Sequence, residues 1–86
     1  MNFIEKYDIV KLANAKEYTV AELYNENDIT FLMLIEMNES EVTENYKFGK
    51  IVVTKTKKYG IEIINQIEEN NRLKEIFEPI FRKDFE

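Results

Sequence analysis

The stretch "ITFLMLIEM" (residues 29–37) decides how the rest of the chain can fold. Successive residues of a β-strand point to opposite faces of the sheet. One face of this stretch carries Ile29, Phe31, Met33, Ile35 and Met37, and the other carries Thr30, Leu32, Leu34 and Glu36. A strand that is apolar on most of both faces is typical of the covered centre of a sheet. The sequence therefore predicts a buried central strand here.

Two further strands are expected around it. "EYTVAELY" (17–24) is rich in residues that favour strands. "NEND" (25–28) predicts a turn, because Asn and Asp tolerate unusual backbone angles. A polar connection, "NESEVTE" (38–44), leads to a third strand, "YKFGKIVVTKT" (46–56), in which Gly49 is a candidate for a bulge. Three consecutive strands with short links predict an antiparallel meander.

A helix is expected before the strands. Phe3, Tyr7 and Val10 recur at helical spacing, which predicts a helix over residues 3–14. The apolar residues from Ile9 onward could instead begin a strand, and the sequence leaves this alternative open.

Helical structure is also expected at the end of the chain. Gly60 marks the predicted change from strand to helix, and apolar residues then recur at helical spacing up to Phe81. The pair at 70–71, two Asn residues, leaves open one helix or two. Pro79 lacks a backbone donor and clashes with the preceding turn, so regular helix should end or kink near Phe77.

The complete prediction is a single α+β domain over residues 1–86. It has an N-terminal helix, a three-stranded antiparallel meander, and one or two C-terminal helices packed on one face.

Composition excludes several classes of chemistry. The 86 residues include neither Cys nor His, so disulfides, thiolate metal sites and histidine general bases are impossible. The only serine, Ser40, has no histidine to activate it. We expect no catalytic residue, metal or cofactor. No stretch approaches the roughly 18 apolar residues of a membrane helix, so the expected location is the cytoplasm.

Charge is strongly segregated along the chain. Residues 17–44 hold eight acids and no base, whereas residues 45–58 hold five lysines and no acid. Residues 1–16 and 59–86 have net charges of +1 and −3, and the whole chain has −5. Such segregation bears on partners and association rates rather than on fold. An acidic surface repels nucleic acid and attracts the basic grooves that bind it.

Two simpler explanations of the acidic stretch stay open. The acids could be ordinary solvated surface, or they could pair with lysines of the third strand. Geometry adds a condition, because the 25–28 turn and the 38–44 connection lie at opposite ends of the central strand in a meander. They form one patch only if Glu22 and Glu36 bridge them on the same exposed face.

The candidate site residues follow from this layout. The predicted partner-binding carboxylates are Glu26, Asp28, Glu39, Glu41 and Glu44. The apolar stripe of the C-terminal segment is expected to be mostly core. Phe81 and Phe85 lie beyond Pro79, and we consider them possible oligomer contacts. The lysine cluster "KTKK" (55–58) is expected to be a solvated strand end.

The first 37 residues resemble small acidic phage-encoded anti-CRISPR proteins that inhibit Cas9. The similar features are a short helix led by Met-Asn, the sequence "KEYTV" (16–20) at the start of a strand, an acidic turn, and "IT" (29–30) opening the next strand. The expected element order is also similar. The resemblance implies a protein without catalysis whose carboxylates occupy the basic cleft that reads the DNA protospacer-adjacent motif. The chain departs from this pattern after residue 45, where a lysine-rich strand follows.

Two functional hypotheses result. The first is a non-enzymatic acidic inhibitor or adaptor that occupies a basic, nucleic-acid-binding surface of a larger protein. It could be encoded by a phage or mobile element and act in the host cytoplasm. The alternative is a homodimeric structural or regulatory domain, similar to an antitoxin, that associates through its C-terminal aromatic helix.

Overall fold

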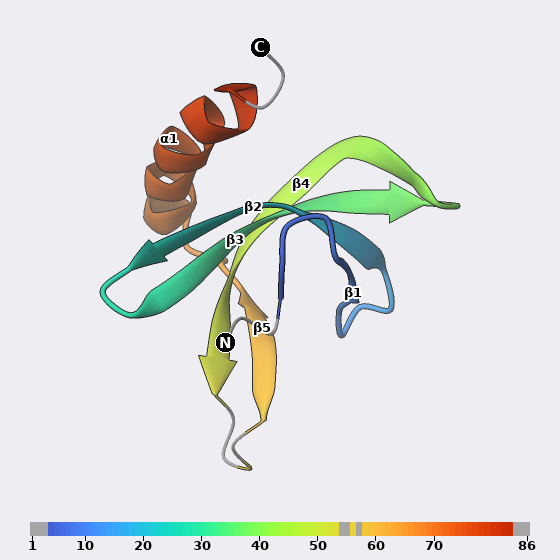
Figure 1. Ribbon diagram of the computed structural model, residues 1–86, viewed down its shortest axis with the longest axis horizontal. Coiled ribbons are helices and arrows are strands. Elements are labelled where there is room, and N and C mark those ends of the chain that lie inside the picture. The colour runs from blue at the N-terminus through green and yellow to red at the C-terminus, as the bar shows by residue number, and fades with distance from the viewer. Residues whose placement is uncertain (1–3, 54–55, 57, 84–86) are drawn as a thin grey trace.

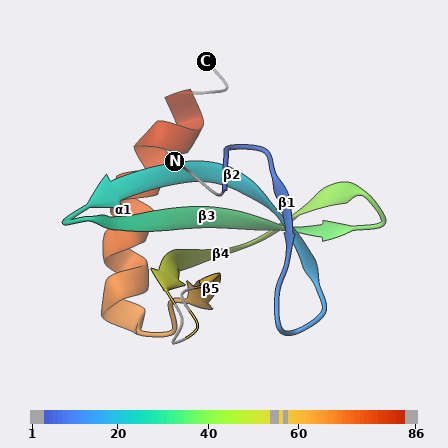
Figure 2. The ribbon, with the colours of Figure 1, turned by 60° about the horizontal axis from the view of Figure 1, so that its bottom comes forward.

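One antiparallel sheet and one helix make up the fold (Figure 1). The computed structural model describes residues 4–53, 56 and 58–83. The strands are β1 (Ile9–Lys11), β2 (Glu17–Glu26), β3 (Ile29–Asn38), β4 (Glu41–Val53) and β5 (Tyr59–Ile63), and the helix is α1 (Ile67–Lys83). The spatial order of the strands is their chain order. The sheet is strongly curled, and α1 lies against one of its faces (Figures 1 and 2).

β3 is the middle strand, as its two apolar faces predict. One face belongs to a helix-side core made of Ala21, Phe31, Met33, Phe48, Leu73 and Phe77. The other belongs to an inner core made of Tyr18, Val20, Leu32 and Leu34, with partly buried Val10, Leu12, Ile51, Ile61 and Ile63 around it. Side chains from β1 and β5, the two outermost strands, thus meet over one cluster. The sheet has to curl around the inner core to bring them together.

The predicted N-terminal helix is wrong. No helix occurs among residues 4–14, and Ile9–Lys11 instead form β1, which pairs antiparallel with the start of β2. The preceding residues continue this contact, because Tyr7 N donates to Val20 O and Val20 N donates to Asp8 O. The alternative of a strand beginning at Ile9 is the one observed. The reason is burial with a period of two, which turns Val10 toward the inner core. The start of the expected helix, including Phe3, lies outside the described residues.

The predicted three-stranded meander is also wrong, since the sheet has five strands. β2 and β3 match their predicted segments closely. The predicted connection over residues 38–44 is mostly strand, because only Glu39 and Ser40 separate β3 from β4.

Gly49 does not form a bulge. It pairs in register with Leu32 on one side and Ile63 on the other. A Cβ at this position would lie 3.0 Å from Cγ2 of Ile61 and 3.2 Å from the carbonyl oxygen of Glu62. Both distances are tighter than ordinary contacts, so glycine at this position eases the close approach of β4 and β5 and does not make a local kink.

Gly60 does not begin a helix but lies inside β5. Ile61 and Ile63 alternate toward the inner core, and the helix begins only at Ile67. The helix predicted to begin after Gly60 is therefore wrong for residues 61–63. These residues form a strand in which every second side chain packs on the inner core.

The C-terminal segment is a single helix that continues past Pro79 to Lys83. Asn70, in the first turn of α1, donates from Nδ2 to the carbonyl oxygen of Ile64 at 3.0 Å, so an Asn of the 70–71 pair links the helix to the segment that precedes it. Phe81 packs against the helix-side core beyond the proline. This burial favours continued helix despite the roughly 3 kcal/mol that an interior proline costs.

Arg72 fixes the helix to the β2–β3 hairpin. Its Nη1 lies 2.7 Å and 3.0 Å from the two carboxylate oxygens of Glu26, and its Nε lies 2.5 Å from Oε1 of Glu69. The guanidinium also lies 5.5 Å from the ring centre of Phe31. These contacts raise the pKa of Arg72, chiefly through the hydrogen bond to Glu69. The same bond lowers the pKa of Glu69.

Candidate functional site: the acidic hairpin

Three of the five predicted partner-binding carboxylates lie on one hairpin. We call residues 37–45, the end of β3 and the start of β4, the acidic hairpin. It includes Glu39, Glu41 and Glu44, which are all exposed. The hairpin projects from the sheet on the side away from α1 (Figures 1 and 2). None of these three side chains forms an ion pair with another residue that the structure describes.

The tip of the acidic hairpin has an unusual sequence for its backbone shape. Asn38 pairs with Glu41, so Glu39 and Ser40 form a two-residue turn with φ angles of 51° and 71°. Such turns favour Gly and Asn, because other side chains clash at positive φ. The turn between β2 and β3 has the same shape but uses Asn27 and Asp28, which tolerate it. The acidic hairpin therefore keeps a glutamate at its tip at some cost in strain.

A wide bulge separates the acidic hairpin from the rest of the sheet. Between the pairs Ile35–Tyr46 and Met37–Val42, only Glu36 lies on β3, whereas three residues lie on β4. Such an insertion bends the strand that carries it. The direction of the acidic hairpin is thus set at Glu36.

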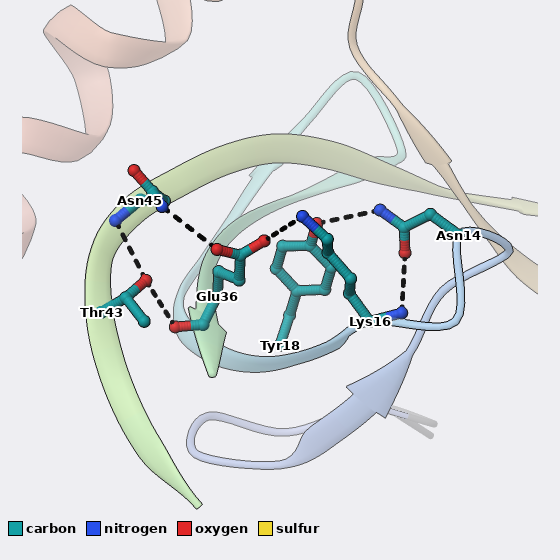
Figure 3. A network of polar contacts seen from close by, with 6 residues as sticks. All are labelled: Asn14, Lys16, Tyr18, Glu36, Thr43 and Asn45. Atoms are coloured by element: carbon teal, nitrogen blue, oxygen red, sulfur yellow. Dashed lines mark hydrogen bonds and ion pairs between the residues drawn. The ribbon is translucent and has the colours of Figure 1, made fainter. Parts of the chain in front are cut away.

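Glu36 holds this bulge together with both its backbone and its side chain (Figure 3). Thr43 Oγ1 donates to the carbonyl oxygen of Glu36 at 2.9 Å and accepts from Asn45 N at 3.2 Å. Asn45 Nδ2 donates to Oε2 of Glu36 at 3.1 Å, and Lys16 Nζ lies 2.9 Å from Oε1. The hydrogen bond from Lys16, followed by that from Asn45, lowers the pKa of Glu36. The same pairing raises the pKa of Lys16.

Lys16 is itself positioned by the loop between β1 and β2. Its backbone N donates to Oδ1 of Asn14 at 3.0 Å, and Asn14 Nδ2 donates to the hydroxyl of the buried Tyr18 at 3.1 Å (Figure 3). The network therefore runs from the inner core, through Lys16 and Glu36, to the base of the acidic hairpin.

A polar hollow of about 490 Å³ lies at this base. Three carboxylates line it, those of Glu17, Glu36 and Glu39, together with Lys16. Because Lys16 pairs with Glu36, the exposed Glu17 and Glu39 carry the negative charge of the rim. Sequence reasoning counted Glu17 among the acids but did not select it. Glu17 lies beside the base of the acidic hairpin because Tyr18 of β2 pairs with Glu36 of β3. The sequence alone does not reveal this pairing register.

The other two predicted carboxylates lie at the far end of β3. Glu26 ends β2 and Asp28 lies in the β2–β3 turn, whereas the acidic hairpin lies at the other end of β3. β3 has ten residues, which corresponds to about 30 Å at roughly 3.3 Å per residue. Figure 1 shows the two turns at opposite ends of the sheet. The five candidates therefore form two separate groups.

The bridge required for a single patch is absent. Glu22 is only 5% exposed and pairs with Lys6, with 3.1 Å between Nζ and Oε1. Glu36 lies on the opposite face of the sheet, since it pairs with Tyr18 whereas Glu22 pairs with Met33. These acids find cations outside the lysine-rich segment, namely Lys6 and Lys16. The alternative left open by the sequence, pairing with lysines of the third strand, therefore does not describe the ion pairs of Glu22 and Glu36.

Glu26 has a structural contact that the sequence did not indicate. It accepts hydrogen bonds from Arg72, as described above, and one from the hydroxyl of Tyr24 at 3.1 Å. The bond to Glu26 raises the pKa of Tyr24. Arg72 lies 46 residues away in the chain, so no local pattern predicts this pair. Asp28 is exposed in the turn itself.

Of the two possible oligomer contacts, only Phe81 is among the described residues, near the end of α1. Phe81 is partly buried against the helix-side core, and Phe85 lies outside the described residues. A cleft of about 350 Å³ beside Phe81 is lined by Tyr46 and Phe48 of β4 and by Phe77. Tyr46 is 42% exposed, so the cleft opens to the surface between α1 and β4.

The described residues contain no group of three acidic side chains that could hold a metal ion. No helix among them is both long enough and apolar enough to cross a membrane. The sequence matches no protein family, no curated protein and no solved structure. The element order of the anti-CRISPR resemblance, one helix and then three strands, differs from the observed order.

Proposed function

We propose that this chain is a non-enzymatic inhibitor or adaptor that uses its acidic hairpin to bind a basic surface of a nucleic-acid-handling protein. The observation that carries the proposal is the projecting hairpin with three exposed carboxylates, Glu39, Glu41 and Glu44, that have no cation partner among the described residues. A phage or mobile element would encode it, and it would act in the host cytoplasm.

Position and rigidity support the proposal. The bulge at Glu36 directs the hairpin away from the body of the molecule, and the bonds from Lys16, Thr43 and Asn45 fix that direction. A preorganised loop loses less conformational entropy on binding. The hollow beside Glu17 and Glu39 has room for a lysine or arginine side chain of the partner. Carboxylates held in this way can replace phosphates in a basic groove.

The β2–β3 turn is not part of the proposed contact. Glu26 pairs with Arg72, and Asp28 is separated from the acidic hairpin by β3, which measures about 30 Å along the strand at roughly 3.3 Å per residue. One basic groove would have to be unusually long to contact both groups.

The test compares matched charge variants in affinity capture from a bacterial lysate. The hairpin variant carries Glu39→Gln, Glu41→Gln and Glu44→Gln. The control carries Glu5→Gln, Glu75→Gln and Glu78→Gln, which remove the same charge from surface positions away from the acidic hairpin. A nucleic-acid-binding protein retained by the unmodified chain and by the control, but lost by the hairpin variant, supports the proposal. Equal retention by all three forms overturns it.

The captured protein must also meet two physical criteria. Its retention should fall steeply with salt, since the contact is electrostatic. Addition of the unmodified chain should release nucleic acid from it, because both ligands use the same basic surface. Capture that is insensitive to salt and leaves nucleic acid bound contradicts the proposal.

A further inference from the structure

The outer edge of β5 presents a row of backbone donors and acceptors. β5 is the last strand in the sheet order, so only one of its sides pairs with β4. On that side, Ile64 N donates to the carbonyl oxygen of Phe48. In an antiparallel strand the N–H and C=O groups of one residue point to the same side, and successive residues alternate. The backbone N–H and C=O groups of Glu62 therefore also point toward β4, whereas those of Ile61 and Ile63 point outward.

This edge has few of the features that block strand pairing. β5 has no proline, and its register with β4 is regular from Gly49–Ile63 to Val53–Tyr59. Natural edge strands are usually short, bulged or covered, because an open edge is a template for another strand. The other edge strand, β1, has only three residues, which limits it as a template.

An apolar cleft of about 560 Å³ runs beside the edge. It lies between β5 and the segments around β1, and its apolar lining comes from Ile4, Leu12, Ala13, Tyr59 and Ile61. Tyr59 is 50% exposed. A strand added to β5 would therefore cover apolar surface as well as satisfy the outward backbone groups.

We propose that a second copy of this chain adds its own β5 to this edge, antiparallel, with the two Ile61 residues opposite each other. In this register Tyr59 of each copy faces Ile63 of the other, which is an aromatic–aliphatic pair that stabilises sheets. Each Ile61 exchanges two backbone hydrogen bonds with its counterpart. The contact is isologous, so a two-fold axis closes it at a dimer.

Charge favours a second copy over an unrelated strand. Lys58 precedes β5, and β5 leads into α1, whose first turn carries the exposed Glu68. An antiparallel two-fold arrangement places the Lys58 end of each copy beside the start of α1 in the other. The edge is therefore complementary to itself. The acidic hairpin begins at the other end of β4, outside the segment that pairs with β5, so both hairpins stay accessible in the dimer.

The first test combines oligomeric state with amide exchange on the full chain. Sedimentation should give a dimer at high concentration and a monomer on dilution. The amide protons of Ile61 and Ile63 should exchange with deuterium much more slowly at the high concentration. A monomer up to the solubility limit overturns the proposal. A dimer in which both amides exchange equally fast at either concentration overturns it too, because association then uses another surface.

The second test exchanges charges. Lys58→Glu alone and Glu68→Lys alone each bring like charges together, and each should weaken dimerisation roughly tenfold. An equimolar mixture of the two variants should regain the affinity of the unmodified chain, as heterodimers. Lys74→Glu and Glu75→Lys, at exposed positions of α1, are the matched controls and should dimerise normally. A mixture that associates no better than its components contradicts the proposed register.

Discussion

Asn45 Nδ2 donates a hydrogen bond to Oε2 of Glu36 at 3.1 Å, across the bulge at which the acidic hairpin leaves the sheet. Lys16 occupies the other carboxylate oxygen at 2.9 Å. The carboxylate of Glu36 thus helps to orient the acidic hairpin, whereas Glu39, Glu41 and Glu44 in the hairpin stay exposed. The structure therefore separates two kinds of acid. Glu36 stabilises the shape of the site, and the exposed acids of the hairpin are the ones that we propose to contact a partner.

Thr43→Val should lower the free energy of unfolding by about 1–2 kcal/mol. Valine preserves the shape of the side chain but removes the donor to Glu36 O and the acceptor for Asn45 N. Chemical denaturation of the two forms measures the difference. Thr30→Val is the control, since its hydroxyl bonds to Asn25 on the exposed surface and its replacement should cost less. Equal losses at both positions would show that the bulge is not held by Thr43.

Stability should fall in acid, in part through Glu36. Its pKa is lowered from the usual 4.5 by the hydrogen bonds from Lys16 and then Asn45. The stabilisation is therefore fully present above 4.5 and is lost as the pH falls through the lowered value of the folded chain. Denaturation of the unmodified chain and of Glu36→Gln across this range measures it. The variant should show a weaker dependence on pH, and identical profiles would exclude the role of Glu36.

The raised pKa of Lys16 predicts that stability also falls at alkaline pH. Its usual value is 10.5, and pairing with Glu36 raises it. This contribution is complete below 10.5 and disappears as the pH rises through the value in the folded chain. Lys16→Met should remove this alkaline part of the pH dependence. An unchanged alkaline profile in Lys16→Met would contradict the assignment.

Ser40→Gly should stabilise the chain by about 0.5–1 kcal/mol. Ser40 has a φ of 71°, which glycine adopts without steric cost. The substitution leaves all carboxylates in place, so partner binding should persist. Ser40→Ala is the control and should give no gain, because alanine keeps a Cβ at positive φ. Thermal denaturation distinguishes the two, and a gain from alanine would argue against backbone strain at this turn.

Arg72→Met should cost about 1 kcal/mol, since the pair with Glu26 joins α1 to β2 but is partly exposed and screened by water. Lys74→Met should change stability far less, because Lys74 lies on the same helix but forms no ion pair with another described residue. Chemical denaturation compares them. Because Arg72 contacts the end of the sheet opposite to the acidic hairpin, partner capture should be unaffected. Loss of capture in Arg72→Met would place the binding surface at the β2–β3 turn.

The sequence predicted the elements whose patterns are long and unambiguous. β3 has apolar residues on both faces over nine positions, and only a central strand explains them. β1 was predicted only as an alternative to a helix and β5 was missed, because both strands are short. Val10 fits both a helical and an alternating pattern. For Ile61 and Ile63, the strand is favoured only because both side chains pack on the inner core, which the sequence does not show.

The sequence predicted which acids of the site are exposed but not how they are arranged. Exposed acids in the 38–44 segment were expected, and Glu39, Glu41 and Glu44 are exposed. Their separation from Glu26 follows from the length of β3. The engagement of Glu26 follows from Arg72, which is distant in sequence. Neither the bulge at Glu36 nor its bond to Lys16 has a sequence signal, because both depend on register.

The most direct test of the proposed function is capture of basic nucleic-acid-binding proteins by the unmodified chain and by the variant with Glu39, Glu41 and Glu44 changed to glutamine, measured at low and high salt. We expect one or more such proteins to be retained at low salt, released at high salt and absent with the variant, while the variant with Glu5, Glu75 and Glu78 changed to glutamine retains them. Retention by both variants alike would contradict a role for the acidic hairpin.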